Sequence, residues 1–106
     1  MVQQPITVDQ VRQPGEASIA GNVTCGVASI VVRQANRHRK EATFTNISDT
    51  RIDIAKSNLA TLNAGIPVYP HGSIIIEPDA SGRIYVGPIS AITSAATKLL
   101  AFTEDW

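Results

Sequence analysis

The side chains best suited to metal binding are few in this chain and stand far apart. The sequence has two histidines, His38 and His71, and one cysteine, Cys25. They fall in three separate segments with no ligand spacing between them. A structural or catalytic zinc site needs three or four converging protein ligands. We therefore expect no metal site and no other cofactor.

The acidic and hydroxyl side chains do not predict catalysis either. Asp49, Asp53, Glu77 and Asp79 stand at expected turns and strand ends, where acidic residues are common for local reasons. No serine of the sequence lies in a nucleophile motif, and the sequence has no glycine-rich phosphate-binding loop. We expect that the protein is not an enzyme.

Cys25 lies in the apolar run of residues 23–27. A single cysteine cannot form an internal disulfide, and the apolar run favours a small, buried and inert thiol. Residues 22–24 and 46–48 match glycosylation sequons. The N-terminus lacks the basic start and apolar block of a signal peptide. We therefore discount the sequons and expect a product folded in the cytoplasm.

Residues 33–40 hold four of the nine lysine and arginine residues. The run falls between two predicted strands and is most simply a solvated hairpin loop. The alternative is a basic loop that docks on an acidic protein surface. Nucleic-acid binding is not expected, because no aromatic residue interleaves the run to stack on bases and the formal net charge is zero. The four basic residues offered for docking are Arg33, Arg37, Arg39 and Lys40.

The elements that must position these side chains are predicted to be β-strands. Residues 70–72 and 78–82 are turn signals. Between them, residues 73–77 form a β-branched run, and residues 83–86 alternate polar and apolar side chains. The density of proline and glycine in this stretch excludes a helix.

Three further segments upstream show strand patterns. Residues 22–34 are apolar on both faces and predict one strand that is covered on both sides over part of its length. Residues 41–46 and 51–54 each alternate polar and apolar side chains. A turn signal separates these two segments, so they are predicted to pair as an antiparallel hairpin.

Two segments are ambiguous between helix and other structure. Residues 55–72 favour an irregular loop with a few apolar anchors, such as Leu59, Leu62 and Ile66. The alanine-rich residues 89–102 fit a helix or a strand. A strand near 97–104 is favoured, because its neighbours are β and the edges of a sheet need partners.

The fold class is therefore all-β, a small β-sandwich or barrel of about six to eight short antiparallel strands with an extended N-terminal arm. Residues 1–21 are assigned to the arm and residues 22–106 to a single β domain, since this length supports one hydrophobic core. Ile6 and Val8 in the arm are suited to adding a strand to the sheet edge of a neighbour. The predicted core residues are Phe44, Ile52, Ile54, Ile74, Ile76, Ile84 and Val86.

Composition points to a partner. Apolar residues make up 43% of the chain, which argues against disorder. Charged residues make up 17%, a low value that suggests that part of the surface is covered in an assembly. No segment is long and apolar enough for a membrane span, so a membrane is not an expected partner.

Residues 37–106 resemble small β-rich virion proteins of tailed bacteriophages, which serve as capsid decoration (cement) proteins or as head-fibre and tail-associated components. The matching features are turns and strands in the same order. They are Arg39-Lys40, Asn46-Ile47-Ser48, residues 51–54, residues 65–74, residues 82–86 and the terminal Glu104-Asp105-Trp106.

The resemblance implies a structural protein on the outer surface of the virion. It would bind the major capsid protein, stabilise the head and form a homo-oligomer, either a trimer or a dimer. The alternative is a head-fibre or tail-associated module that recognises a cell-surface glycan, with Tyr69, Tyr85 and Trp106 as aromatic platforms. The family brings no catalytic or ligand-binding residues. The predicted partner contacts are Ile6, Val8 and the four basic residues of 33–40.

Overall fold

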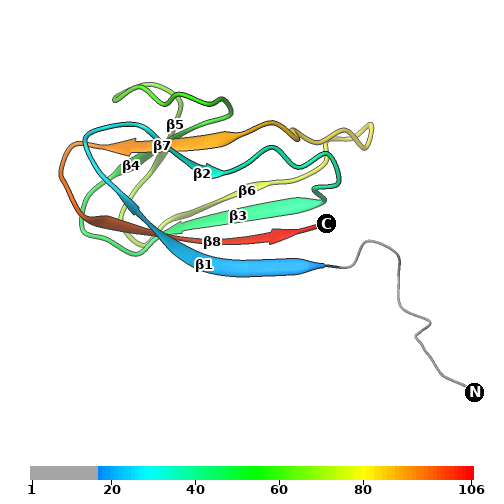
Figure 1. The fold of residues 1–106 in the computed structure, drawn as a ribbon, viewed down its shortest axis with the longest axis horizontal. Coiled ribbons are helices and arrows are strands. Elements are labelled where there is room, and N and C mark those ends of the chain that lie inside the picture. Colours follow the sequence, from blue (N-terminus) through cyan, green and yellow to red (C-terminus); the bar gives the residue numbers. More distant parts are fainter. Residues whose placement is uncertain (1–16) are drawn as a thin grey trace, which may run out of the picture.

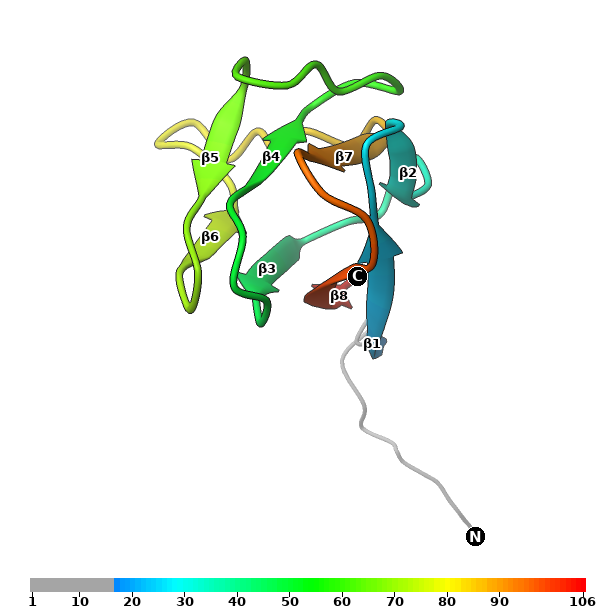
Figure 2. The same cartoon turned by 90° about the vertical axis from the view of Figure 1, so that its left-hand side faces the viewer.

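The computed structural model describes residues 17–106, which form two antiparallel four-stranded sheets stacked face to face (Figures 1 and 2). Sheet A has the strand order β1-β8-β3-β6 and sheet B the order β2-β7-β4-β5. The predicted all-β sandwich is confirmed. The strands are β1 (Ser18–Cys25), β2 (Ile30–Arg33), β3 (Glu41–Asn46), β4 (Ile52–Ala55), β5 (Ile66–Val68), β6 (Ser73–Ile76), β7 (Ile89–Thr93) and β8 (Lys98–Asp105).

The chain passes repeatedly from one layer to the other, as the view along the sandwich shows (Figure 2). β3 belongs to sheet A and β4 to sheet B. The predicted hairpin between them is therefore wrong, because the turn at residues 47–50 carries the chain across the core instead of back along the same sheet. A strand pattern indicates which face is buried, and it does not indicate which sheet supplies the partner.

The segment predicted as one strand over residues 22–34 is two strands in different sheets. β1 ends at Cys25 and β2 begins at Ile30. The carbonyl of Gly26 accepts a hydrogen bond from the Thr93 N–H at 2.9 Å, where the chain leaves sheet A. β1 also begins at Ser18, so residues 18–21 lie in the sheet and not in the arm. Residues 1–16 of the arm, with Ile6 and Val8, lie outside the described residues.

Residues 83–86 were predicted as a strand and form none. The Val86 carbonyl accepts a hydrogen bond from the Asn36 N–H at 2.8 Å, so this segment pairs with a loop. The next strand is β7, at Ile89–Thr93. It was not predicted, because the alanine-rich residues 89–102 also fit a helix. The irregular loop predicted over residues 55–72 is confirmed only outside Ile66–Val68, which form the strand β5. The predicted final strand near residues 97–104 is confirmed as β8. No helix occurs in residues 17–106, and hence none long and apolar enough to cross a membrane.

The hydrophobic core lies between the two sheets. Four of the seven predicted core residues are buried: Phe44, Ile52, Ile54 and Ile76. Ile74 and Ile84 are partly buried against this cluster. Val86 is 37% exposed, so its assignment to the core is wrong. Burial of Cys25, at 1% exposure, is confirmed.

Asn46 ties the two sheets together at one end of the sandwich. Its side chain is fully buried. Its Nδ2 donates to the carbonyls of Thr50 and Val68, at 2.8 Å each, and its Oδ1 accepts from the N–H of Ser48 at 2.9 Å. Buried amides need such partners. The asparagine thus fixes the crossing turn, and its burial leaves no room for a glycan at this sequon.

Candidate functional site

A buried ion-pair cluster occupies the end of the sandwich where the basic run lies. Glu104 of β8 is fully buried. One of its carboxylate oxygens, Oε1, accepts from Arg33 Nε. The other, Oε2, accepts from Arg39 Nε at 2.7 Å and from Asn36 Nδ2 at 3.1 Å. The carboxylate is therefore enclosed by donors from the end of β2 and from the connection between β2 and β3.

Arg39 is saturated with acceptors. Beyond Glu104, its guanidinium donates to the carbonyls of Tyr85 at 3.1 Å, Gly87 at 2.9 Å and Gln34 at 2.9 Å. Its side chain has no exposed surface. The interpretation of residues 33–40 as a solvated loop is wrong at this residue, because the arginine holds the loop against β8 and the segment before β7.

Of the other three basic residues predicted to contact a partner, one is engaged internally and two are exposed. Arg33 pairs with Glu104, and its guanidinium carbon lies 4.9 Å from the centre of the Phe102 ring, a cation–π distance. Arg37 and Lys40 point to solvent. The structure thus divides the basic run into two structural arginines and two residues that remain accessible to a partner.

Two opposing effects act on the pKa of the Glu104 carboxyl. Burial raises this pKa, because the charged form loses its hydration. Hydrogen bonds from Arg39, Arg33 and Asn36 lower it, and the net pKa lies below the usual value for glutamate. Glu104 is therefore ionised at neutral pH and has no proton to give, which suits a structural ion pair and not an acid catalyst.

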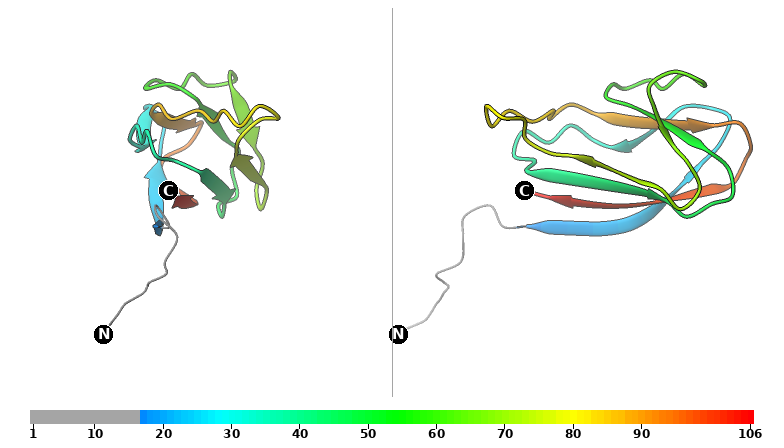
Figure 3. Two further views of the ribbon diagram at one scale, coloured as in Figure 1. Left: turned by 90° about the vertical axis from the view of Figure 1, so that its right-hand side faces the viewer. Right: turned by 180° about the vertical axis from the view of Figure 1, so that it is seen from behind.

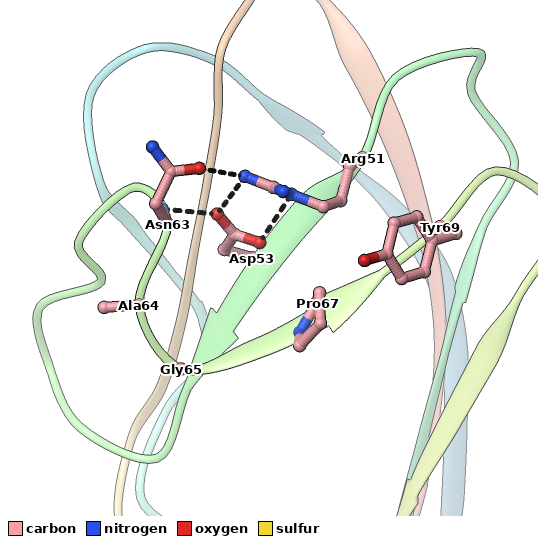
Figure 4. A pocket seen from close by; sticks show the side chains of 7 residues that line it. All are labelled: Arg51, Asp53, Asn63, Ala64, Gly65, Pro67 and Tyr69. Atoms are coloured by element: carbon pink, nitrogen blue, oxygen red, sulfur yellow. Dashed lines mark hydrogen bonds and ion pairs between the residues drawn. The ribbon is translucent and has the colours of Figure 1, made fainter.

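A second polar cluster lines a hollow of about 150 Å³ on the outer side of sheet B (Figure 4). Arg51 Nε lies 3.0 Å from Asp53 Oδ1, and Arg51 also donates to Asn63 Oδ1. The N–H of Asn63 donates to Asp53 Oδ2 at 2.8 Å. Asp53 is 2% exposed. Tyr69, which is 61% exposed, stands at the rim of the hollow.

The turn at residues 61–65 buries Asp53. Ile52 and Ile54 face the core, so the side chain between them must point outward from sheet B. The turn folds over it with positive φ at Asn63 (66°) and Gly65 (93°). A Cβ at Gly65 would lie 2.6 Å from the Ile54 carbonyl oxygen, so only glycine fits there.

The three aromatic residues named as platforms differ in exposure. Tyr69 is exposed, whereas Tyr85 and Trp106 are partly buried. The Tyr85 hydroxyl donates to the Pro88 carbonyl at 2.7 Å. One platform therefore remains, next to the Arg51–Asp53–Asn63 cluster.

Within residues 17–106 no three or more histidine, cysteine, aspartate or glutamate side chains gather in a metal-binding group. His38 and His71 are exposed in different loops. The partner of the basic run, Glu104, was missed because it stands 65 residues after Arg39. A lone carboxylate that follows Leu100 and Phe102 in the inward row of the final strand is the one signal that could have identified it.

The outer face of sheet A carries few charges. The pairing register aligns Ala20, Thr103, Thr43 and Ile75 in one row across all four strands. Charged side chains among the described residues of this face, Glu41 and Asp105, stand together at one end. The other members are Ser18, Asn22, Thr24, Thr45, Ser73, Leu99 and Ala101. We call this set the sheet A face.

Cys25 provides a test of the core at the end of β1. Burial raises the pKa of its thiol to about 11 from 9.0, so at pH 8 almost none of it is thiolate. We expect iodoacetamide to modify it at least about tenfold more slowly in the folded protein than in denaturant. The protonated thiol favours the folded state below pH 9, and this contribution is lost as the pH rises toward 11. Equal rates by mass spectrometry would contradict the burial.

Comparison of the chain with protein-family models, with curated proteins and with solved structures finds no match.

Proposed function

We propose that the protein is a structural virion component, a capsid decoration protein that binds the major capsid protein through the sheet A face and stabilises the head. The observation that carries this proposal is the face itself. Sheet B has an outer side chain, Asp53, that the chain's own turn buries. Sheet A leaves Thr103 of its central strand exposed, together with Ile75 and Leu99.

The composition of the face suits a protein partner. Threonine, serine and asparagine side chains can form hydrogen bonds across an interface, and burying them costs less than burying charged side chains. Thr45 and Ser73 already share a hydrogen bond of 2.8 Å across two strands, which orders these two side chains. A surface built on paired strands can meet a partner without rearrangement of its backbone.

The rest of the molecule suits this role because it is held rigid. The Glu104 cluster fixes one end of the sandwich and Asn46 the other. A cement protein acts by mass action: each copy bound to assembled subunits stabilises the shell, and no chemical step is needed. Rigidity lowers the entropy lost on binding.

Of the predicted basic contacts, Arg37 and Lys40 stay in the proposal. These two exposed charges are suited to steering the protein toward an acidic capsid surface. Their effect should be seen at low salt, because exposed charges are screened within about 10 Å at 0.1 M ionic strength. Arg33 and Arg39 leave the proposal, since Glu104 engages both.

The sheet A face is tested by placing a charge at its centre. Thr103→Arg should weaken co-sedimentation with heads that lack the protein by at least about tenfold, because the charge must be buried unpaired. Thr61→Arg is the matched control, since Thr61 is exposed in the loop over sheet B. Both variants should keep the unfolding midpoint of the parent.

Two results would overturn the assignment. Thr103→Arg that sediments as fully as Thr61→Arg would show that the partner does not contact this face. A copy number of a few per particle, measured on purified virions, would indicate a fibre or tail component and not a decoration protein.

Glycan recognition is the second candidate function, and the hollow beside Tyr69 favours it. An exposed aromatic ring can stack on a sugar, and the Asn63 side-chain nitrogen is directed away from Arg51 (Figure 4). The carboxylate of Asp53 is engaged by Arg51 and by the Asn63 N–H, which leaves few polar groups for a ligand. Binding on a glycan array that Tyr69→Ala abolishes would support this function, and no binding by the parent would exclude it for the glycans tested.

A further inference from the structure

Three of the four sheet edges are blunted against pairing with another chain. β5 is three residues long and contains Pro67. β6 is four residues long and lies between Pro70 and Pro78. β2 is four residues long, and its register with β7 shifts between Val31 and Arg33. Short strands, prolines and bulges are the devices that keep edges from associating.

The edge strand β1 has none of these devices. It is eight residues long, contains no proline and no charged residue, and pairs with β8 over eight consecutive residues without a register shift. Within residues 17–106 no strand pairs with the side of β1 that faces away from β8. β1 lies at one margin of the lower layer in Figure 2 and is also seen from behind in Figure 3. A long, uncharged edge of this kind is a template for another strand.

The hydrogen-bond pattern identifies the backbone groups of this free edge. Ala17 and Trp106 exchange two backbone hydrogen bonds, of 2.6 and 2.9 Å, at the start of the β1–β8 ladder. In an antiparallel pair, bonded and non-bonded residues alternate. Every second residue from Ala17 therefore bonds to β8, and the residues between them point their N–H and C=O groups outward. These residues are Ser18, Ala20, Asn22 and Thr24.

We propose that a second copy of this chain pairs with that edge, β1 against β1 in antiparallel orientation about a two-fold axis at Gly21. The axis is perpendicular to the sheet, so inner and outer faces continue across it and only residues on the same face stand opposite each other. Ser18 then faces Thr24 of the second copy, and Ala20 faces Asn22. In this register all four outward-pointing residues of each chain pair with the other copy. The four residue pairs exchange two bonds each, or about eight hydrogen bonds. An axis at Asn22 would leave Ser18 without a partner strand residue.

The side chains near the axis fit this pairing. Ile19, which is 41% exposed, is brought against Val23 of the second copy on the inner side. Gly21, at the axis, lies over the Phe102 ring of its own chain, where an added Cβ would stand 3.2 Å from the ring. The Asp105 end of one copy is brought toward the Lys98 end of the other, so no like charges meet.

The dimer would contain one continuous eight-stranded sheet, in which the sheet A face of each copy extends into that of the other. The pairing follows from the edge alone and does not depend on the proposed capsid role. Of the two oligomers predicted from the sequence, the dimer fits this pairing and the trimer does not. In a two-fold β1–β1 contact each copy uses its only free β1 edge, so no third copy can join in the same way.

The test is Ala20→Pro in the full-length chain, compared with Ala20→Thr. The N–H of Ala20 points to the free edge, so proline removes a contact to the second copy and no bond to β8. Sedimentation velocity over a concentration series should show dimers for the parent and for Ala20→Thr. For Ala20→Pro the dissociation constant should rise at least about tenfold. A parent that is monomeric at every concentration, or trimeric, would overturn the proposal.

Hydrogen exchange on the parent protein tests the β1–β1 pairing even if Ala20→Pro fails to fold. The amides of Ala20 and Asn22 should exchange more slowly as the protein concentration rises, while those of β6 stay unchanged. In a parent that sediments as a monomer, slow exchange at these amides would show that the chain's own residues cover the edge, and it would overturn the pairing. Fast exchange at all concentrations would overturn it as well.

Discussion

Glu104→Gln is expected to lower the free energy of unfolding by about 3–5 kcal/mol, the usual cost of removing one partner from a buried ion pair. Glutamine keeps the shape of the side chain and removes its charge. Arg39 would then be left as a fully buried cation. Its remaining acceptors are backbone carbonyls, which carry no net charge to balance it. A loss of this size is a large share of the stability of a small domain. Urea unfolding of parent and variant measures it.

Asp79→Asn provides the matched control for this prediction. Asp79 pairs with Arg83 at 3.8 Å, and both side chains are largely exposed. Exposed pairs contribute little, so the control should change the free energy of unfolding far less than Glu104→Gln does. If both variants lose the same free energy of unfolding, the Glu104 cluster stabilises the fold no more than a surface ion pair does, and the structural role argued for it is wrong.

The same variant should respond differently to acid. The pKa of Glu104 is lower in the folded state than its ordinary value. Its charge therefore stabilises the fold above the unfolded pKa, near 4.3, and this contribution disappears as the pH falls through the lower folded pKa. Glu104→Gln has no such charge to lose. The stability difference between parent and variant should accordingly narrow below pH 4.

Local pattern was enough to predict β3, β4, β6 and β8. It could not predict how the strands are distributed between the sheets. Alternation at residues 41–46 and 51–54 correctly placed Phe44, Ile52 and Ile54 inward. The same alternation fits a hairpin or a crossing between layers, and the buried hydrogen bonds of Asn46 decide for the crossing. Those bonds depend on a carbonyl of β5, which no local pattern reveals.

The polar clusters were beyond local prediction for the same reason. A run of basic residues in a predicted loop is usually solvated, and Arg37 follows that rule. Arg39 departs from it because the fold brings β8 beside the loop with a single carboxylate on its inner row. Asp53 was interpreted as a strand-end residue, although the turn that buries it lies ten residues later. In both clusters, sequence separation hid the partner.

Phe44→Ala is expected to cost about 3–5 kcal/mol, the range for truncating a buried phenylalanine. Phe44 is fully buried in β3, a central strand of sheet A. Its neighbours across the ladder are Ile74 on β6 and Phe102 on β8, and both are only partly buried. The cavity left by alanine is thus flanked by strands that pair on both sides and cannot close over it without breaking hydrogen bonds.

A graded series makes this prediction specific to packing. Phe44→Leu restores most of the volume and should cost less than half as much as alanine, because the loss scales with the residual cavity. Tyr69→Ala removes an aromatic ring that is 61% exposed and should change stability by less than about 0.5 kcal/mol. Chemical denaturation of the three variants gives the comparison. A loss below about 1 kcal/mol for Phe44→Ala would mean that the two sheets do not meet at this side chain, and the register of β3 within sheet A would have to be reassigned.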